Sequence, residues 1–186
     1  MSARLALAAI PSAAGVKARR GPAGHPRYCP AVDRRSAFLS YVRGDRTFAR
    51  RLHGDLTAHG VTCFVDDVSM LPGDDLDATL GEAIARSDVF LLACSERSLG
   101  SPADWWWVDR EMSHVLQREQ DETRAGRVRS LRLVPLDLDG YLFDPTCTYP
   151  RRADLASRVA APFRGWEDDP ATYEAGLSRL LRALEA

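Results

Sequence analysis

The sequence predicts an α/β domain in which about five parallel strands alternate with helices that cover both faces of the sheet. Short, almost continuously apolar segments recur along the chain, for example at 37–41, 61–65 and 89–93. Between them, apolar residues return every three or four positions, which is typical of amphipathic helices. Strands that are apolar on both sides belong to parallel sheets buried on both faces. Right-handed crossovers then give a flavodoxin-like, doubly wound arrangement.

The remaining elements follow the same alternation. Residues 1–35 lack hydrophobic periodicity and are rich in glycine and proline, so we expect a disordered leader before a folded domain at 36–186. A fourth strand is predicted at 131–136. A fifth, at 159–163, is restricted to a sheet edge by its proline. In such sheets ligands bind outside the carboxyl ends of the strands, which here means the loops that begin at Tyr41, Asp66, Cys94 and Asp137.

Charge and composition exclude several classes of function. Residues 1–32 carry a charge of +5, which leaves −6 for the remainder of a chain whose total is −1. A folded domain with a net negative charge is unsuited to binding the phosphates of nucleic acid. No apolar run reaches 18 residues, so no membrane span is expected. The four cysteines form no C-x-x-C pair and the histidines share no ligand spacing. We therefore expect no metal site and a reducing, cytoplasmic environment.

The stretch 101–111 is the most informative part of the chain. Ser101 and Pro102 are typical of a helix start, as a hydroxyl cap followed by proline at the first helical position. The helix is predicted to run to about residue 122. Its apolar face carries Trp105, Val108, Met112, Val115 and Leu116.

Trp107 and Glu111 lie four residues apart and are predicted to fall on a different flank of this helix, together with His114. We expect Glu111 there to bury little surface. Packing does not require a second tryptophan directed away from the core, one turn from a carboxylate. The alternative is a solvated glutamate beside a tryptophan covered by a loop.

Read together, the motifs resemble a Toll/interleukin-1 receptor (TIR) domain, specifically of the bacterial type. The resemblance covers the chain from about residue 36 to its end, and the order and spacing of its motifs are more specific than any one of them. The matching segments are Phe38-Leu-Ser-Tyr41 with Arg43 and Asp45, Phe64-Val-Asp66 with Leu71-Pro-Gly73, Leu91-Leu-Ala-Cys-Ser95, Trp107-Val-Asp-Arg-Glu111, Val134-Pro-Leu-Asp137 with Asp139-Gly140, and Phe163-Arg-Gly-Trp166.

The W-x-x-x-E segment resembles the signature of NAD-cleaving members of this family. The resemblance implies an NAD⁺ glycohydrolase or ADP-ribosyl cyclase in prokaryotic antiphage defence, with Glu111 as the catalytic residue. NAD⁺ is then the substrate, and no cofactor or metal is expected. The residues implied in substrate binding are Tyr41, Arg43, Asp66, Trp107 and Phe143.

The alternative is a non-catalytic module that pairs with other TIR domains. The resemblance implies self-association through the loop that contains Leu71-Pro-Gly73, which serves either function. A separately encoded sensor or effector is the further partner expected. Glu111 paired with Trp107 favours the enzyme, because a scaffold has no use for that pair.

Overall fold

The computed structural model describes residues 35–65, 76–126 and 132–185, without the side chains of 76–80, Asp104, Trp106 and Trp107. The expected leader therefore lies outside the described residues, apart from Arg35. The loop that contains Leu71-Pro-Gly73 also lies outside them.

The described residues form one sheet of five parallel strands in the order β2-β1-β3-β4-β5. This confirms the predicted doubly wound α/β fold, with Pro162 in a two-residue strand at the sheet edge. The other strand boundaries differ from the prediction by one residue. The strands are β1 (Ser36–Ser40), β2 (Thr62–Val65), β3 (Val89–Cys94), β4 (Arg132–Asp137) and β5 (Ala161–Pro162).

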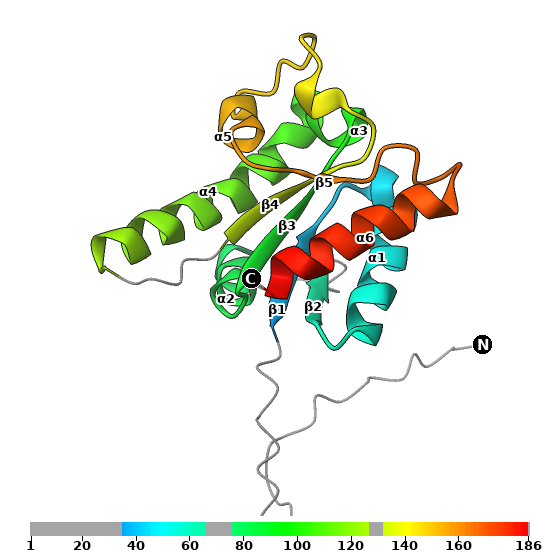
Figure 1. Ribbon diagram of the computed structural model, residues 1–186. Helices are drawn as coiled ribbons and strands as arrows, with labels where there is room; N and C mark the ends of the chain where they lie inside the picture. Colours follow the sequence, from blue (N-terminus) through cyan, green and yellow to red (C-terminus); the bar gives the residue numbers. More distant parts are fainter. Residues whose placement is uncertain (1–34, 66–75, 127–131, 186) are drawn as a thin grey trace, which may run out of the picture. The chain divides into compact units, whose positions relative to one another are not determined.

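Helices cover both faces of the sheet (Figure 1). Apolar residues of α1 and α6 form one buried cluster with one face of the strands, and those of α2 and α4 form a second cluster with the other face. The helices are α1 (Arg46–Ala58), α2 (Leu76–Ala85), α3 (Glu96–Leu99), α4 (Pro102–Arg124), α5 (Arg152–Ala156) and α6 (Pro170–Glu185), with 3₁₀ turns η1 (Arg43–Asp45) and η2 (Tyr141–Phe143). No described helix is both long and apolar enough to cross a membrane.

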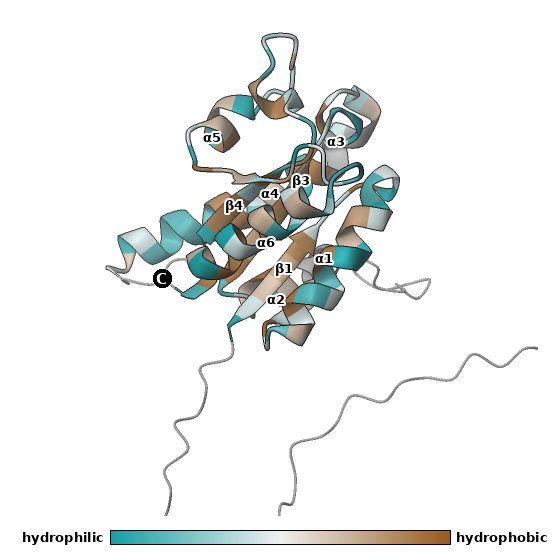
Figure 2. Ribbon diagram, turned by 45° about the vertical axis from the view of Figure 1, so that its right-hand side comes forward, coloured by the Kyte–Doolittle hydropathy of each residue, from teal (hydrophilic) through white to brown (hydrophobic). Residues whose placement is uncertain are grey.

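Hydropathy follows this layering. The strands are the most apolar segments, while the outer sides of α4 and α6 are polar (Figure 2). Along β1 the side chains alternate, so that Phe38 stacks on Phe90 of β3 towards α4, while Leu39 joins the cluster of α1 and α6. β3, at the centre of the sheet, is buried along its whole length.

The start of α4 has the expected caps. The Ser101 hydroxyl accepts a hydrogen bond from the amide of Ala103, and Pro102 opens the helix. The Trp105 indole donates to the carbonyl of Leu99 at 2.8 Å, which ties α4 to the end of α3. Local sequence signals therefore fix where α4 begins.

α6 approaches β5 very closely at Gly176. A Cβ atom at this position would lie 2.4 Å from the carbonyl oxygen of Pro162 and 2.8 Å from the ring of Phe163. Only glycine fits between the helix and the sheet edge without displacing backbone atoms.

The C-terminal end of α2 is held by Arg118 of α4. Its guanidinium donates to the carbonyl oxygens of Ile84 and Ser87, the latter at 2.9 Å, and pairs with Glu122 at 2.8 Å. Carbonyl groups at a helix end otherwise lack partners. Arg118 thus connects α2 to α4, on the face of the sheet where Glu111 lies.

We expect Arg118→Ala to lower the free energy of unfolding by about 2 kcal/mol, since it removes charged hydrogen bonds to partly buried acceptors. Arg86→Ala is the matched control, because its pair with Glu82 is 3.5 Å long and solvent-exposed and such pairs contribute about 0–1 kcal/mol. Urea unfolding measures both. Equal losses for the two variants would contradict this role of Arg118.

Candidate functional site

The carboxyl ends of β1, β3 and β4 bring several polar side chains to one rim of the sheet. β1 lies between β2 and β3, where the strand order reverses, and ligands of doubly wound sheets bind at such a switch point. Ser40 ends β1 and Asp45 follows it. Ser95 follows β3, and Asp137 ends β4.

Glu111 lies inside this rim rather than on an exposed flank. Its exposed fraction is 0%, and the hydroxyl of Ser40, itself 1% exposed, donates a hydrogen bond to its Oε2. The expectation that Glu111 buries little surface was therefore wrong. The bond links the end of β1 to the middle of α4, across the face of the sheet that carries Phe38.

Helical spacing explains why Glu111 is buried. Glu111 is three residues after Val108 and four before Val115, both buried in the cluster between α4 and the sheet. These intervals place it on the same face as those residues. His114, predicted beside it, is only half-buried. The carboxylate occupies a position in the apolar face of α4 where packing alone would favour a hydrophobic side chain.

Ser40 is the residue near Glu111 that the sequence did not single out. In the sequence, Ser40 stands out only as part of the segment 38–41. A signal was nevertheless present, because a serine two positions after Phe38 on the same face of an apolar strand is a buried hydroxyl that requires a partner.

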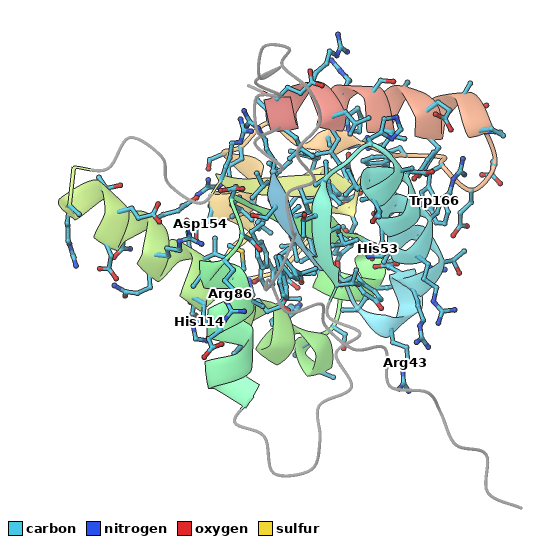
Figure 3. All side chains as sticks on the ribbon, turned by 90° about the horizontal axis from the view of Figure 1, so that it is seen from below. Arg43, His53, Arg86, His114, Asp154 and Trp166 are labelled. Carbon is cyan, nitrogen blue, oxygen red and sulfur yellow. The ribbon has the colours of Figure 1, made fainter. Side chains whose placement is uncertain are left out.

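The structure describes the side chains of three of the other predicted site residues. Tyr41 is 9% exposed and belongs to the cluster on the α1 and α6 side of the sheet, opposite to the side on which Ser40 contacts Glu111. Arg43 is exposed and extends away from the sheet (Figure 3). Phe143, 40% exposed, lies 5.9 Å from the guanidinium carbon of Arg164. Asp66 and the Trp107 side chain lie outside the described residues, and the binding roles of all five stay predictions.

A second buried carboxylate, Asp45, lies at the same rim. It accepts a hydrogen bond from the Ser95 hydroxyl at 2.6 Å, and its other oxygen is 3.5 Å from Arg97. Burial raises the pKa of Asp45, and these two neighbours oppose the shift. Ser95 also caps α3, so the Asp45 carboxylate joins the loop after β1 to the loop after β3.

Asp45 and Ser95 line a polar cavity of about 420 Å³ together with Asp139, Arg164 and Trp166. Asp137 borders this region, where its carboxylate accepts from Arg164 Nε at 2.6 Å and from the amide of Gly140 at 2.8 Å. Gly140 has φ of 91°, and a side chain there would meet Arg164. Trp166 lies beside α1 (Figure 3), where its ring meets that of Phe48 edge-on with the centroids 5.2 Å apart. This network orders the loops after β4 and β5.

Acidic, histidine and cysteine side chains do not assemble into a metal site anywhere in the described ranges. The polar side chains described at the rim are carboxylates, hydroxyls and guanidinium groups. Glu111 accepts a hydrogen bond from Ser40, Asp45 lies beside Ser95 and Arg97, and Asp137 pairs with Arg164.

Doubly wound sheets with polar groups at the switch point form a broad class of ligand-binding domains, and comparison with known proteins narrows it. A family model described as TIR domain matches residues 37–181. The chain is similar to the TIR domains of the Roq1 resistosome, which recognises the pathogen effector XopQ, with 17% identity, a TM-score of 0.56, and coverage of 81% of this chain and 99% of that one.

The TIR domain of the Toll-related receptor TRR-2 from Hydra magnipapillata is also similar, with 17% identity, a TM-score of 0.52, and coverage of 81% of this chain and 98% of that one. At these identities the likeness shows the fold. A search of curated protein sequences gave no match. Since the family model spans more than half of the chain, the protein belongs to the TIR domain family.

The raised pKa of Asp45 predicts a pH dependence of stability. A carboxyl group whose pKa is higher in the folded than in the unfolded chain favours folding while protonated, and this contribution is lost as the pH rises through the folded pKa. Relative to Asp45→Asn, which stays neutral, the wild type should lose stability as the pH rises from about 4, near the ordinary pKa of aspartate. Urea unfolding of both proteins over the acidic range measures the difference. A wild type that gains relative stability with pH would contradict the assignment.

Proposed function

We propose that this chain is an NAD⁺ glycohydrolase or ADP-ribosyl cyclase that cleaves the bond between nicotinamide and ribose. The observation that carries the proposal is the fully buried carboxylate of Glu111 with the Ser40 hydroxyl donating to it. Placing a carboxylate in an apolar helix face costs free energy that a leucine there would not. Membership of the TIR family and the W-x-x-x-E motif support the same reading.

A single carboxylate is chemically sufficient for this reaction. Most glycosidases need a second carboxylic acid to protonate a poor leaving group. The nicotinamide of NAD⁺ is already a cationic pyridinium and departs neutral without a proton donor. The remaining requirement is to stabilise positive charge on the ribose, and an ionised glutamate in a site that excludes water supplies this.

Ser40 is the positioning residue in this proposal. Its hydroxyl donates to Oε2 of Glu111 from the rigid end of β1, so one carboxylate oxygen is fixed relative to the sheet. Pre-oriented groups stabilise a transition state without reorganising during the reaction. Tyr41, Arg43 and Phe143 are proposed to contact the base and the pyrophosphate, as the resemblance implies.

Access to Glu111 requires a rearrangement, because the carboxylate has no exposed surface in the single chain. We propose that self-association through TIR–TIR contacts provides it. The enzyme would then be silent as a monomer and active when assembled. A role in prokaryotic antiphage defence, with a separately encoded sensor or effector, is consistent with such control.

The second candidate function is a TIR–TIR interaction module without catalysis, and a groove beside α6 favours it. The groove has a volume of about 430 Å³ and is lined by β5, part of α6 and Val159, which is 94% exposed. Its basic residues are Arg179 and Arg182, whereas the segment 66–75 contains four aspartates. A second copy of this chain offers the complementary charge.

Glu111→Gln separates the two functions. It keeps the volume of the side chain and an oxygen that can accept from Ser40, so we expect an unchanged fold. NAD⁺ cleavage should fall by at least about 100-fold, the scale for losing a key electrostatic group. Wild type and variant are incubated with NAD⁺ under crowding at several protein concentrations, and products are resolved by mass. Equal NAD⁺ loss in both would exclude Glu111, and no loss in either would leave the interaction module as the function.

Ser40→Ala tests the positioning role. With the hydroxyl removed, kcat should fall about tenfold, the scale of one charged hydrogen bond, with little change in KM. Ser36→Ala is the matched control, because Ser36 lies on the same face of β1 but bonds to Asp88 at the opposite end. Steady-state kinetics under assembling conditions measure both variants. A Ser40→Ala enzyme with wild-type kcat would show that Glu111 needs no such support.

A further inference from the structure

Phe143, which the proposed function assigns to substrate contact, lies on a turn that neighbouring elements hold from several sides. The turn η2 places Leu142 in the core, with no exposed surface, and the next side chain, Phe143, at the surface with 40% of its area exposed. A buried anchor and an exposed ring are thus adjacent in the sequence. The position of the ring then depends on what holds the backbone of this turn.

Carboxylates bind the amide groups at the start of the turn. The amide of Gly140 donates to Asp137 at 2.8 Å. The amide of Tyr141 donates to Asp139 at 3.0 Å. Amide groups that open a helical turn have no partner within it. The backbone that leads to Phe143 is therefore fixed to the end of β4.

The carbonyl groups at the end of the turn bind one side chain of α5, that of Arg152. Its Nε donates to the carbonyl oxygen of Leu142 at 2.9 Å, and its Nη2 donates to that of Phe143 at 3.2 Å. A planar guanidinium carries its donors in a fixed geometry. Arg152 therefore fixes two consecutive carbonyl groups, one of them that of Phe143 itself.

Arg152 is in turn connected to α4, the helix that carries Glu111. The hydroxyl of Tyr149, a buried residue, donates to Asp109 of α4 at 2.8 Å. The amide of Arg152 donates to the carbonyl of Tyr149 at 3.0 Å. A continuous set of hydrogen bonds thus runs from α4 through Tyr149 and Arg152 to the backbone of Phe143.

A second arginine faces the ring. The guanidinium carbon of Arg164 lies 5.9 Å from the ring centroid of Phe143, and Asp137 accepts a hydrogen bond from Arg164 Nε at 2.6 Å. A cation within about 6 Å of an aromatic face is attracted to it. The ring of Phe143 is consequently restrained as well as its backbone.

From these contacts we propose that Arg152 is a positioning residue for substrate binding, which fixes the backbone of Phe143 so that the ring is in place before NAD⁺ arrives. This inference rests on the proposed function and adds a residue that no sequence motif indicated. Groups that are ordered before binding lose less conformational entropy when the ligand binds. Because Arg152 acts through Phe143 and not through Glu111, its removal should weaken substrate binding and spare the chemical step.

A double-mutant cycle tests this role. Arg152→Ala should raise KM for NAD⁺ about fivefold, the scale of ordering one mobile group on binding, with kcat nearly unchanged. Arg152→Lys retains a donor for the carbonyl groups and should recover part of the loss. Phe143→Ala should raise KM at least as much, and adding Arg152→Ala to it should have no further effect. Steady-state kinetics of the full-length chain under assembling conditions measure all of these proteins.

Arg158→Ala is the matched control. Arg158 follows α5 and donates to the two carboxylate oxygens of Glu119 of α4, at 2.7 and 3.1 Å, so it connects the same region to α4 rather than to η2. This variant should lose thermal stability to at least the extent of Arg152→Ala and keep the wild-type KM. Thermal melts show that each variant is folded.

Three results would overturn the inference: an unchanged KM in Arg152→Ala, an equal effect of Arg152→Ala with and without the Phe143 ring, or an equal rise of KM in Arg158→Ala. The cycle is repeated on NAD⁺ binding in the Glu111→Gln background by calorimetry, which needs no turnover. A non-additive cycle in binding, without cleavage by the wild type, would overturn the proposed glycohydrolase alone. Cleavage with an additive cycle would overturn this inference alone, and absence of both binding and cleavage would overturn both.

Discussion

A parallel sheet must be covered on both faces, and this constraint governs the rest of the domain. β1 and β3 lie at its interior with side chains alternating between two helical layers. Every residue of these strands therefore has a defined side. The alternation ends with Ser40 directed towards α4 and Tyr41 in the cluster of α1 and α6. Ser40 and Tyr41, which are adjacent in the sequence, thus lie on opposite faces of the sheet.

Buried polar groups concentrate where the strands end. Glu111 with Ser40, Asp45 with Ser95, and Asp137 with Gly140 each join a strand end or its loop to a neighbouring element. Burying a carboxylate is unfavourable unless hydrogen bonds replace its hydration. The rim meets this requirement with short hydroxyls and loop amides, which are rigid donors. The loops are consequently ordered by the same groups that give the rim its chemistry.

Much of the fold was predictable because its signals are local. Apolar runs predicted the strands, and Ser101 with Pro102 predicted the start of α4. The doubly wound arrangement followed from the handedness of the crossovers. The candidate site was harder to predict from the sequence. The burial of Glu111 depends on which side of α4 rests on β1, and assigning the helix face from Trp105 and Trp107 placed the carboxylate on the wrong flank. Ser40 was missed because its partner is 71 residues away, and no sequence spacing encodes that contact.

The spacing between α6 and β5 at Gly176 affects only one side of the domain. The absence of a side chain there sets how tightly α6 rests on β5, and hence the width of the groove beside Val159. A single larger residue would widen that groove without altering α4, whose glutamate lies on the other layer of helices. The shape of that groove and the polar side chains at the rim can then vary independently of each other.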